Sequence, residues 1–103
     1  MKTWVGVVSL SMEISGAASL KDRRQVTRSL SDRLRKRFSV SCADLGPDGM
    51  WNMADITAVF ASSSHREAET RAERCLAFLR GAENEGEFVI PETRREVFAH
   101  GDF

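Results

Sequence analysis

Polar and apolar residues alternate along the first part of the chain, over Trp4–Ile14. Every second residue of this segment is apolar or a glycine, and serines and Glu13 stand between them toward its end. Because the side chains of a strand point to opposite faces with a period of two, this pattern predicts a long strand with one buried face. Apolar stretches predict three further strands, at Ser39–Leu45, at Met50–Ala61 and from Phe88 onward.

Two other segments repeat their apolar residues with the period of a helix. Over residues 19–38 an apolar residue recurs at every fourth position, and Ser19 is the expected N-cap. A second helix is expected to follow Ser64, which has the capping-box spacing with Glu67, and to end at Gly81. The predicted buried stripes are Val26, Leu30, Leu34 and Phe38 in the first helix, and Ala68, Ala72, Cys75, Leu76 and Leu79 in the second.

The connections and the order of these elements predict the fold. Gly46-Pro47-Asp48-Gly49 indicates a turn between the second and third strands, and Pro91 places the last strand at an edge or a bulge. Strand, helix, strand, strand, helix, strand, with right-handed crossovers, gives a ferredoxin-like α+β sandwich, βαββαβ. Its sheet has four antiparallel strands with both helices on one face. We expect one domain over residues 1–99 and a frayed tail over 100–103.

The other face of this sheet is expected to stay open and to be half apolar. The alternation places Val5 and Val7 of the first strand beside Thr57 and Val59 of the third. These four residues are candidate contacts for a homodimer or another partner. RNA-binding domains of this topology stack bases on aromatic side chains of the same strands, and no aromatic residue occupies those positions here. The sequence therefore argues against reading of single-stranded bases on this face.

Charge is distributed unevenly along a chain that is neutral overall. The segment 19–38 holds eight Lys or Arg residues and two Asp residues, a net charge of +6, so the remainder of the chain carries −6. Such a separation creates a local positive field, which favours binding of phosphate or of an acidic partner.

Several of these basic residues fall on one side of the predicted helix. At 100° per residue, four of them lie within about 60° of one another, roughly opposite the apolar stripe. Arginine is suited to bidentate phosphate contacts, whereas a solvated face with weak ion pairs is the ordinary alternative, and both interpretations stay open. The four are Lys21, Arg24, Arg28 and Arg35; with Arg23 and Lys36 beside them, they are the candidate contacts for RNA.

No catalytic or metal-binding signature is recognisable. Cys42 and Cys75 lie in different elements without CxxC spacing, and His65 and His100 are isolated, so we expect reduced thiols and no metal or cofactor. The loop 15–19 lacks the arginine of acylphosphatase loops of this topology. We therefore expect a protein that is not an enzyme. Without an export signal or a membrane-spanning run, the expected location is the cytoplasm.

Three stretches carry a resemblance to a known group of proteins: SLKDRR at 19–24, RLRKRFSVS at 33–41 and MWNMADI at 50–56. On these residues the chain resembles the YlxP-like family of small bacterial proteins, long catalogued as a domain of unknown function, over nearly its whole length. The resemblance implies the ferredoxin-like fold and a bacterial origin. Family members are often encoded beside translation initiation factor two and ribosome-binding factor A, which implies work on RNA or the ribosome.

The basic helix and the resemblance together predict a non-enzymatic accessory protein of bacterial translation or ribosome assembly, which contacts RNA or the ribosome through its first helix. The alternative is a dimeric regulatory or protein-interaction module that uses the open sheet face. Salt-sensitive RNA retention indicates the first function, whereas salt-insensitive dimerisation indicates the second.

Overall fold

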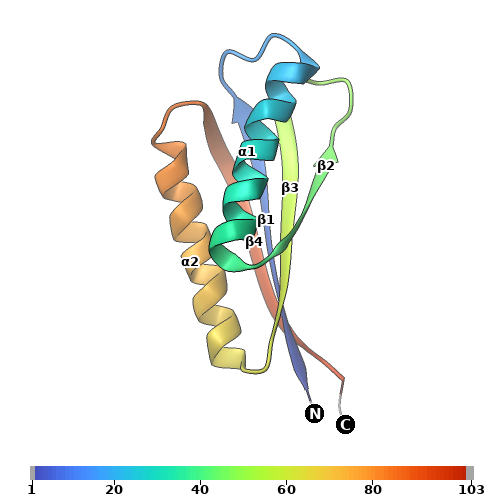
Figure 1. The fold of residues 1–103 in the computed structure, drawn as a ribbon, viewed down its shortest axis with the longest axis vertical. Helices are drawn as coiled ribbons and strands as arrows, with labels where there is room; N and C mark the ends of the chain where they lie inside the picture. Colours follow the sequence, from blue (N-terminus) through green and yellow to red (C-terminus); the bar gives the residue numbers. More distant parts are fainter. Residues whose placement is uncertain (1, 102–103) are drawn as a thin grey trace.

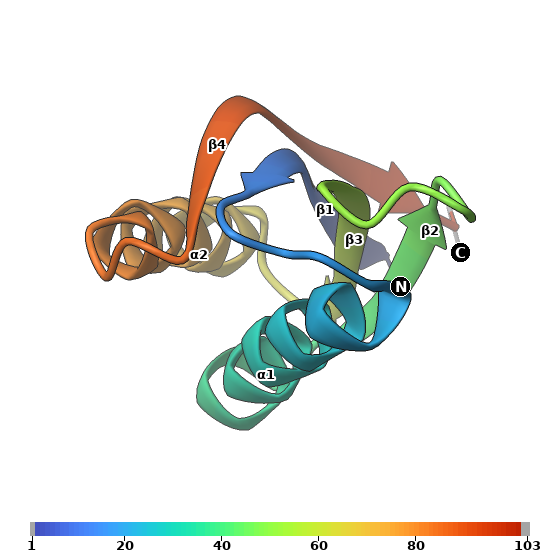
Figure 2. The same ribbon diagram turned by 90° about the horizontal axis from the view of Figure 1, so that it is seen from above.

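The structure, a computed structural model, describes residues 2–101 and confirms the predicted βαββαβ order. One antiparallel sheet has the strand order β2-β3-β1-β4, and both helices lie on the same side of it (Figures 1 and 2). The protein thus has a ferredoxin-like α+β fold. The elements are β1 (Thr3–Ile14), α1 (Leu20–Phe38), β2 (Ser41–Gly46), β3 (Met53–Ser62), α2 (His65–Glu83) and β4 (Phe88–His100).

Both helices begin where their capping residues predict. The side chain of Ser19 accepts a hydrogen bond from the amide of Asp22 at 3.1 Å, and Ser64 accepts from the amide of Glu67 at 3.2 Å. Each capping residue has extended backbone angles, as an N-cap requires. Local sequence therefore determines the start of each helix.

Two predicted ends are wrong. α2 does not stop at Gly81 but continues to Glu83, and its last turn buries Ala82 in the core. β4 extends to His100, which pairs with Thr3 of β1, so His100 is the end of a strand and not part of a frayed tail. The last two residues of the chain lie outside the described range. The start of β1 and the end of β4 consequently lie at the same end of the sheet (Figure 1).

Pro91 lies at a bulge in an edge strand, in agreement with the sequence. Among residues 2–101, β4 pairs with β1 alone, and the register shifts so that Ser11 is opposite Glu92 while Glu13 is opposite Val89. The shift inserts an extra residue in β4 next to the proline. A residue without an amide hydrogen thus stands where the ladder is already interrupted.

One glycine of β1 is required by close packing. Gly6 lies opposite Phe60, and a Cβ atom at Gly6 would be 2.1 Å from the ring Cζ of Phe60.

The guanidinium of Arg71 lies 4.4 Å from the centroid of the Phe60 ring. Arg71 also donates to the carbonyl oxygens of Phe38 and Ser39 at the end of α1. This arginine therefore connects α2, the sheet and the C-terminus of α1.

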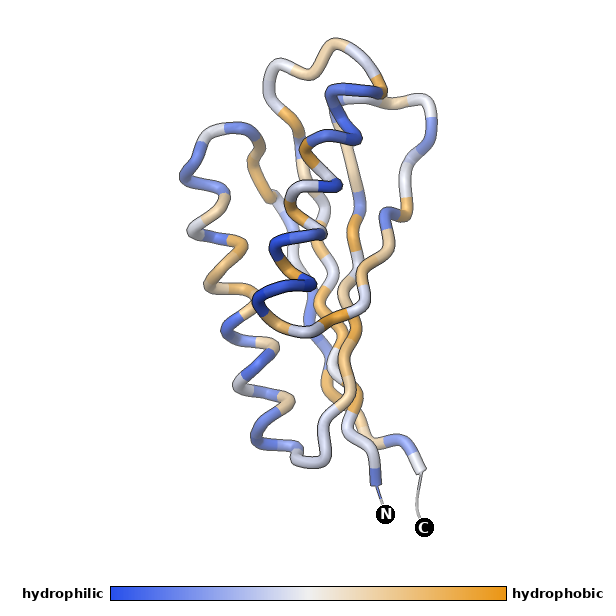
Figure 3. The backbone as a smooth tube through the Cα atoms, in the orientation of Figure 1, coloured by the Kyte–Doolittle hydropathy of each residue, from blue (hydrophilic) through white to orange (hydrophobic). Residues whose placement is uncertain are grey.

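The core lies between the sheet and the two helices, and strongly hydrophilic residues recur along both helices (Figure 3). The predicted stripes lie in this core, although Val26, Phe38 and Leu76 are only partly buried. α1 packs on β2 and β3, whereas α2 packs mainly on β1 and β4. Neither described helix is long and apolar enough to cross a membrane.

Candidate functional site

Four basic side chains of α1 extend into solvent with neither an acidic partner nor an aromatic contact among residues 2–101. Lys21, Arg24, Arg28 and Lys36 are all exposed, and no carboxylate within residues 2–101 forms an ion pair with them. They occupy the side of α1 that faces away from the core. We call these four residues the outer surface of α1. Their charges are therefore available to a ligand.

Arg35 belongs only partly to this surface. Its guanidinium donates to a carboxylate oxygen of Asp32 at 3.2 Å and to the carbonyl oxygen of Cys42 at 3.1 Å. The second bond connects α1 to β2, whose outer edge carries that carbonyl. Arg35 is exposed, yet two of its hydrogen bonds are already made within the protein.

Two other basic residues of α1 are turned toward α2. Arg33 makes two hydrogen bonds to the carboxylate of Glu85, at 3.1 and 2.9 Å. The guanidinium carbons of Arg33 and Arg37 lie 5.0 and 5.4 Å from the ring centroid of Phe78. These contacts join α1 to Phe78 of α2 and to the turn that follows α2.

The structure corrects the placement of Arg23. Its side chain is not beside the outer surface of α1 but buried, with 4% of the residue exposed. The guanidinium donates to both carboxylate oxygens of Asp44 at 3.0 and 2.9 Å, and its Nε donates to the carbonyl oxygen of Met53 at 2.8 Å. Arg23 therefore connects the start of α1 to the β2–β3 hairpin, and its buried guanidinium is not accessible to a ligand.

Asp44 is kept ionised by these contacts. Burial opposes its ionisation, but the hydrogen bonds from Arg23 and from the Gly46 amide, with the positive charge of Arg23, outweigh burial and lower the pKa of the carboxyl. Asp44 also lines a hollow of about 240 Å³ with exposed arginines of α1. Because the charge of Asp44 is matched by Arg23, it does not offset the charges of Arg24 and Arg28 at the hollow. The lining residues are Arg24, Thr27, Arg28, Ser31, Arg35 and Asp44.

The predicted interface residues lie together on the open face of the sheet. Val7 is opposite Val59, which is 37% exposed, and Val5 is opposite Phe98 of β4, which is 42% exposed. Phe98 was not among the predicted residues, because only the start of the last strand was recognisable in the sequence. Its pairing with Val5 adds an aromatic ring to the apolar part of the open face.

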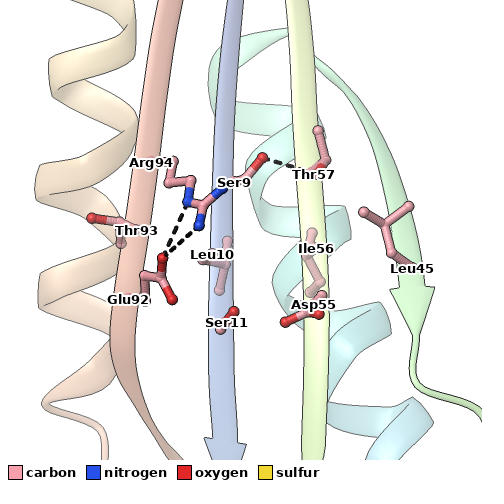
Figure 4. A pocket seen from close by; sticks show the side chains of 10 residues that line it. All are labelled: Ser9, Leu10, Ser11, Leu45, Asp55, Ile56, Thr57, Glu92, Thr93 and Arg94. Atoms are coloured by element: carbon pink, nitrogen blue, oxygen red, sulfur yellow. Dashed lines mark hydrogen bonds and ion pairs between the residues drawn. The ribbon is translucent and has the colours of Figure 1, made fainter.

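Polar side chains occupy the middle of the same face (Figure 4). The hydroxyls of Ser9 and Thr57 lie 3.0 Å apart and form a hydrogen bond, and Arg94 pairs with Glu92 at 3.1 Å. They line part of a shallow hollow of about 270 Å³, which also includes Leu45. Since none of the lining residues is aromatic, the hollow offers no platform for stacking a base.

The two cysteines are free thiols in the structure. Burial raises the pKa of Cys75 to about 11, so this thiol is neutral at physiological pH. Burial also raises the pKa of Cys42, although the nearby Arg35 acts in the opposite direction. Within residues 2–101, no three His, Cys, Asp or Glu side chains gather in a way that would hold a metal ion.

Comparison with known proteins places the chain in a family. The family described as "Protein of unknown function (DUF503)" matches residues 5–94. The chain belongs to this family. The DUF503 protein is also 29% identical over 75 residues to the uncharacterized protein YlxP of Bacillus subtilis strain 168, which covers 73% of this chain and 82% of that one. The resemblance to YlxP-like proteins is thereby confirmed.

Solved structures show the same fold at low sequence identity. SnoaB from Streptomyces nogalater, described as a cofactor-independent oxygenase, has a TM-score of 0.54 with 17% identity, over 97% of this chain and 95% of that one. A protein named YJCS gives a TM-score of 0.54 with 6% identity, over 89% and 96%. A putative antibiotic biosynthesis monooxygenase from Chloroflexus aurantiacus gives 0.50 with 14% identity, over 97% of each chain.

These structures overturn the expectation that the DUF503 protein is not an enzyme. That expectation depended on the lack of catalytic and cofactor motifs in a ferredoxin-like domain. SnoaB shares the fold and is described as an oxygenase that needs no cofactor. A ferredoxin-like chain without such motifs is therefore not excluded from catalysis, and the likeness itself extends to the fold alone.

Proposed function

We propose that this DUF503 protein binds the phosphate backbone of a structured RNA through the outer surface of α1, in bacterial translation or ribosome assembly. The observation that carries the proposal is the set of four exposed basic side chains without acidic partners among the described residues. Such side chains attract phosphate, and release of counterions on binding supplies much of the affinity.

The neighbouring residues support contact with phosphate rather than with bases. Arg24 and Arg28 line the hollow between α1 and β2, and the carboxylate among its lining residues, Asp44, is already paired with Arg23. Two arginine forks beside one hollow suit the oxygen atoms of adjacent phosphates. Because the open face of the sheet has no aromatic residue in its central hollow, base stacking has no support there. The ribosomal setting is what the family resemblance implies.

The test is co-sedimentation with ribosomal subunits at low and high salt. We compare the wild type with Arg24→Glu combined with Arg28→Glu, which reverses two charges on the outer surface of α1. The matched control is Arg66→Glu combined with Arg74→Glu, which makes the same change of charge at exposed positions of α2. We expect the first variant to lose binding and the control to retain most of it. The salt slope should fall by roughly 0.7 to 0.9 for each phosphate that the variant no longer neutralises.

Two results would contradict the proposal. Equal pelleting of the wild type and the Arg24/Arg28 variant would show that the outer surface of α1 is only a solvated face. Equal losses in the α1 variant and the α2 control would show that net charge, rather than a defined surface, governs retention.

A second candidate function is a protein-interaction module that uses the open face. It is favoured by the exposed aromatic ring of Phe98, which lies beside the predicted contacts Val5, Val7 and Val59. Val7→Lys combined with Val59→Lys would then abolish binding of the partner while the chain still folds. Unchanged association of that variant, measured by sedimentation of the complex, rejects this candidate.

A further inference from the structure

The two edges of the sheet are protected to different extents. β2 forms one edge with six residues, and Arg35 of α1 occupies the carbonyl oxygen of Cys42. β4 forms the other edge with thirteen residues. Since a long unpaired edge is a template for another strand, proteins normally shorten, cover or interrupt it. The backbone N–H and C=O groups at the β4 edge are therefore open to pairing unless other groups of the protein occupy them.

The hydrogen bonds of β1 show which groups of β4 point outward. The amide of Ile14 donates to Asn52, beside β3, at 2.9 Å, and the amide of Ser15 donates to Glu87, beside β4, at 3.0 Å. Because this direction alternates along a strand, the odd-numbered residues of β1 bond to β4. Their partners in β4 are even-numbered from Glu92 onward. The residues that direct N–H and C=O away from the sheet are Thr93, Arg95, Val97 and Ala99.

Only the first part of this edge is covered. The amide of Ile90 donates to a carboxylate oxygen of Glu83 at 2.6 Å, and Arg80 donates to the Ile90 carbonyl oxygen at 3.1 Å. Pro91 then removes one amide hydrogen. From Thr93 to Ala99, no hydrogen bond within residues 2–101 occupies the outward backbone groups. We call this stretch the free edge of β4.

We propose that the free edge of β4 pairs with the same edge of a second copy of the chain, antiparallel and around a two-fold axis at Arg95. In this register Thr93 lies opposite Val97 of the second copy and exchanges backbone hydrogen bonds with it. On the open face, Arg94 of each copy lies opposite Glu96 of the other. The free edge is thus complementary in charge to itself.

Charge selects this register among its neighbours. If the second β4 slides by two residues along the first in one direction, Glu96 of one copy lies opposite Glu96 of the other. If it slides by two residues in the other direction, the two Arg94 residues lie opposite each other. Like charges directly opposite each other destabilise a strand pair, and opposite charges stabilise it. The two Arg95 side chains meet at the axis on the helix side, but each already contacts Glu69 and Glu73 of its own chain, at 3.7 and 3.3 Å. Their mutual repulsion is therefore reduced.

The pairing is independent of the proposed RNA contact. α1 packs over β2 and β3, near the β2 edge of the sheet, and this edge is opposite the free edge of β4 (Figures 1 and 2). The outer surfaces of α1 in both copies therefore stay exposed in the pair. The pairing also differs from a stacking of two open faces, because it leaves Val7 and Val59 uncovered.

The experiment is charge reversal across the axis, followed by sedimentation equilibrium. Arg94→Glu alone and Glu96→Arg alone each place like charges opposite each other twice in a homodimer. We expect each to weaken self-association by roughly tenfold or more. An equimolar mixture of the two variants restores opposite charges at both contacts and should associate as the wild type does. Arg66→Glu, a charge reversal on α2, is the control and should not change the association.

Amide hydrogen exchange provides a second measurement on the wild type. The amides of Thr93, Arg95 and Val97 should gain protection as protein concentration rises, while their exchange in the Arg94→Glu variant stays independent of concentration. A wild type that remains monomeric at high concentration overturns the proposal, as does a mixture that fails to restore association. Loss of the dimer in Val7→Lys combined with Val59→Lys, with both charge variants still dimeric, would place the interface on the open face instead.

Discussion

The inner and outer sides of α1 use the same type of residue for different purposes, as the adjacent residues Arg23 and Arg24 show. Arg23 is buried, and its guanidinium makes three hydrogen bonds to Asp44 and Met53. Arg24 is exposed and has no carboxylate partner among the described residues. A basic helix is therefore not one surface. Its inner arginine holds the fold, and its outer arginines are free for a ligand.

Residues on the two sides of α1 contribute differently to the free energy of unfolding, because one side is buried and the other is exposed. A buried ion pair is costly to break because the remaining partner keeps a charge that solvent reaches poorly. An exposed charge without a partner contributes little to stability, since water solvates it in the folded and unfolded states alike. Stability measurements should therefore distinguish neighbouring arginines that the sequence presents as equivalent.

The largest effect is expected from Arg23→Met compared with Arg24→Met. Removing the Arg23 guanidinium takes two hydrogen bonds and the positive partner from the Asp44 carboxylate, which keeps only the Gly46 amide as a donor, and one hydrogen bond from the Met53 carbonyl. Because the Asp44 side chain is 34% exposed, water recovers part of the loss, and we expect destabilisation of about 2 to 3 kcal/mol. Arg24→Met should change stability by less than about 0.5 kcal/mol. Urea denaturation measures both, and equal midpoints for the two variants would remove the distinction between the sides.

A pH series sharpens the same comparison. The hydrogen bonds from Arg23 hold the pKa of Asp44 below its ordinary value, which is about 3.9 in an unfolded chain. The stabilisation is therefore complete above the unfolded pKa and is lost as the pH falls through the lower folded pKa. Asp44→Asn should be less stable than the wild type at neutral pH, and the difference should narrow in acid. A constant difference from neutral pH to about pH 3 would contradict this account.

The smallest effect is expected for the ion pair at the outer margin of the helices. Arg33 and Glu85 form a bidentate pair, but both side chains are well exposed, at 39% and 53%. Solvent and salt screen such a pair, and its ordering costs side-chain entropy. Glu85→Gln should shift the urea midpoint by no more than the error of the measurement. A shift comparable to that of Arg23→Met would show that exposure does not rank these arginines.

Much of the fold follows from local periodicity, and the exceptions have a common cause. Alternation predicted β1, and capping residues predicted the start of both helices. β4 was predicted only in its first part, because beyond Pro91 its positions carry charged residues on both faces. An edge strand buries few side chains, so burial leaves no alternating pattern in its sequence. Its length became evident only through its pairing with β1.

The candidate site was predictable in part. Helical phase alone placed Lys21, Arg24 and Arg28 on the outer side of α1. The same rotation of 100° per residue brings Arg23 between Leu30 and Leu34, on the apolar stripe, and this signal indicates burial. Because Arg23 stands within a run of basic residues, it was predicted to lie beside the RNA contacts instead. That Asp44 receives Arg23 could not be inferred, since the two residues are 21 positions apart and meet only when β2 packs beneath α1.

The sequence by itself determined the order of the elements, the start of each helix and the concentration of positive charge on α1, because these depend on residues close together along the chain. The tertiary structure decided which arginines stay free and which backbone edge stays unpaired. Both depend on contacts between distant segments: Arg23 with Asp44, Arg35 with Cys42, and the Ile90 backbone with Arg80 and Glu83. A charge or a backbone group becomes available for binding only where such a contact is absent, and periodicity along one segment carries no information about it.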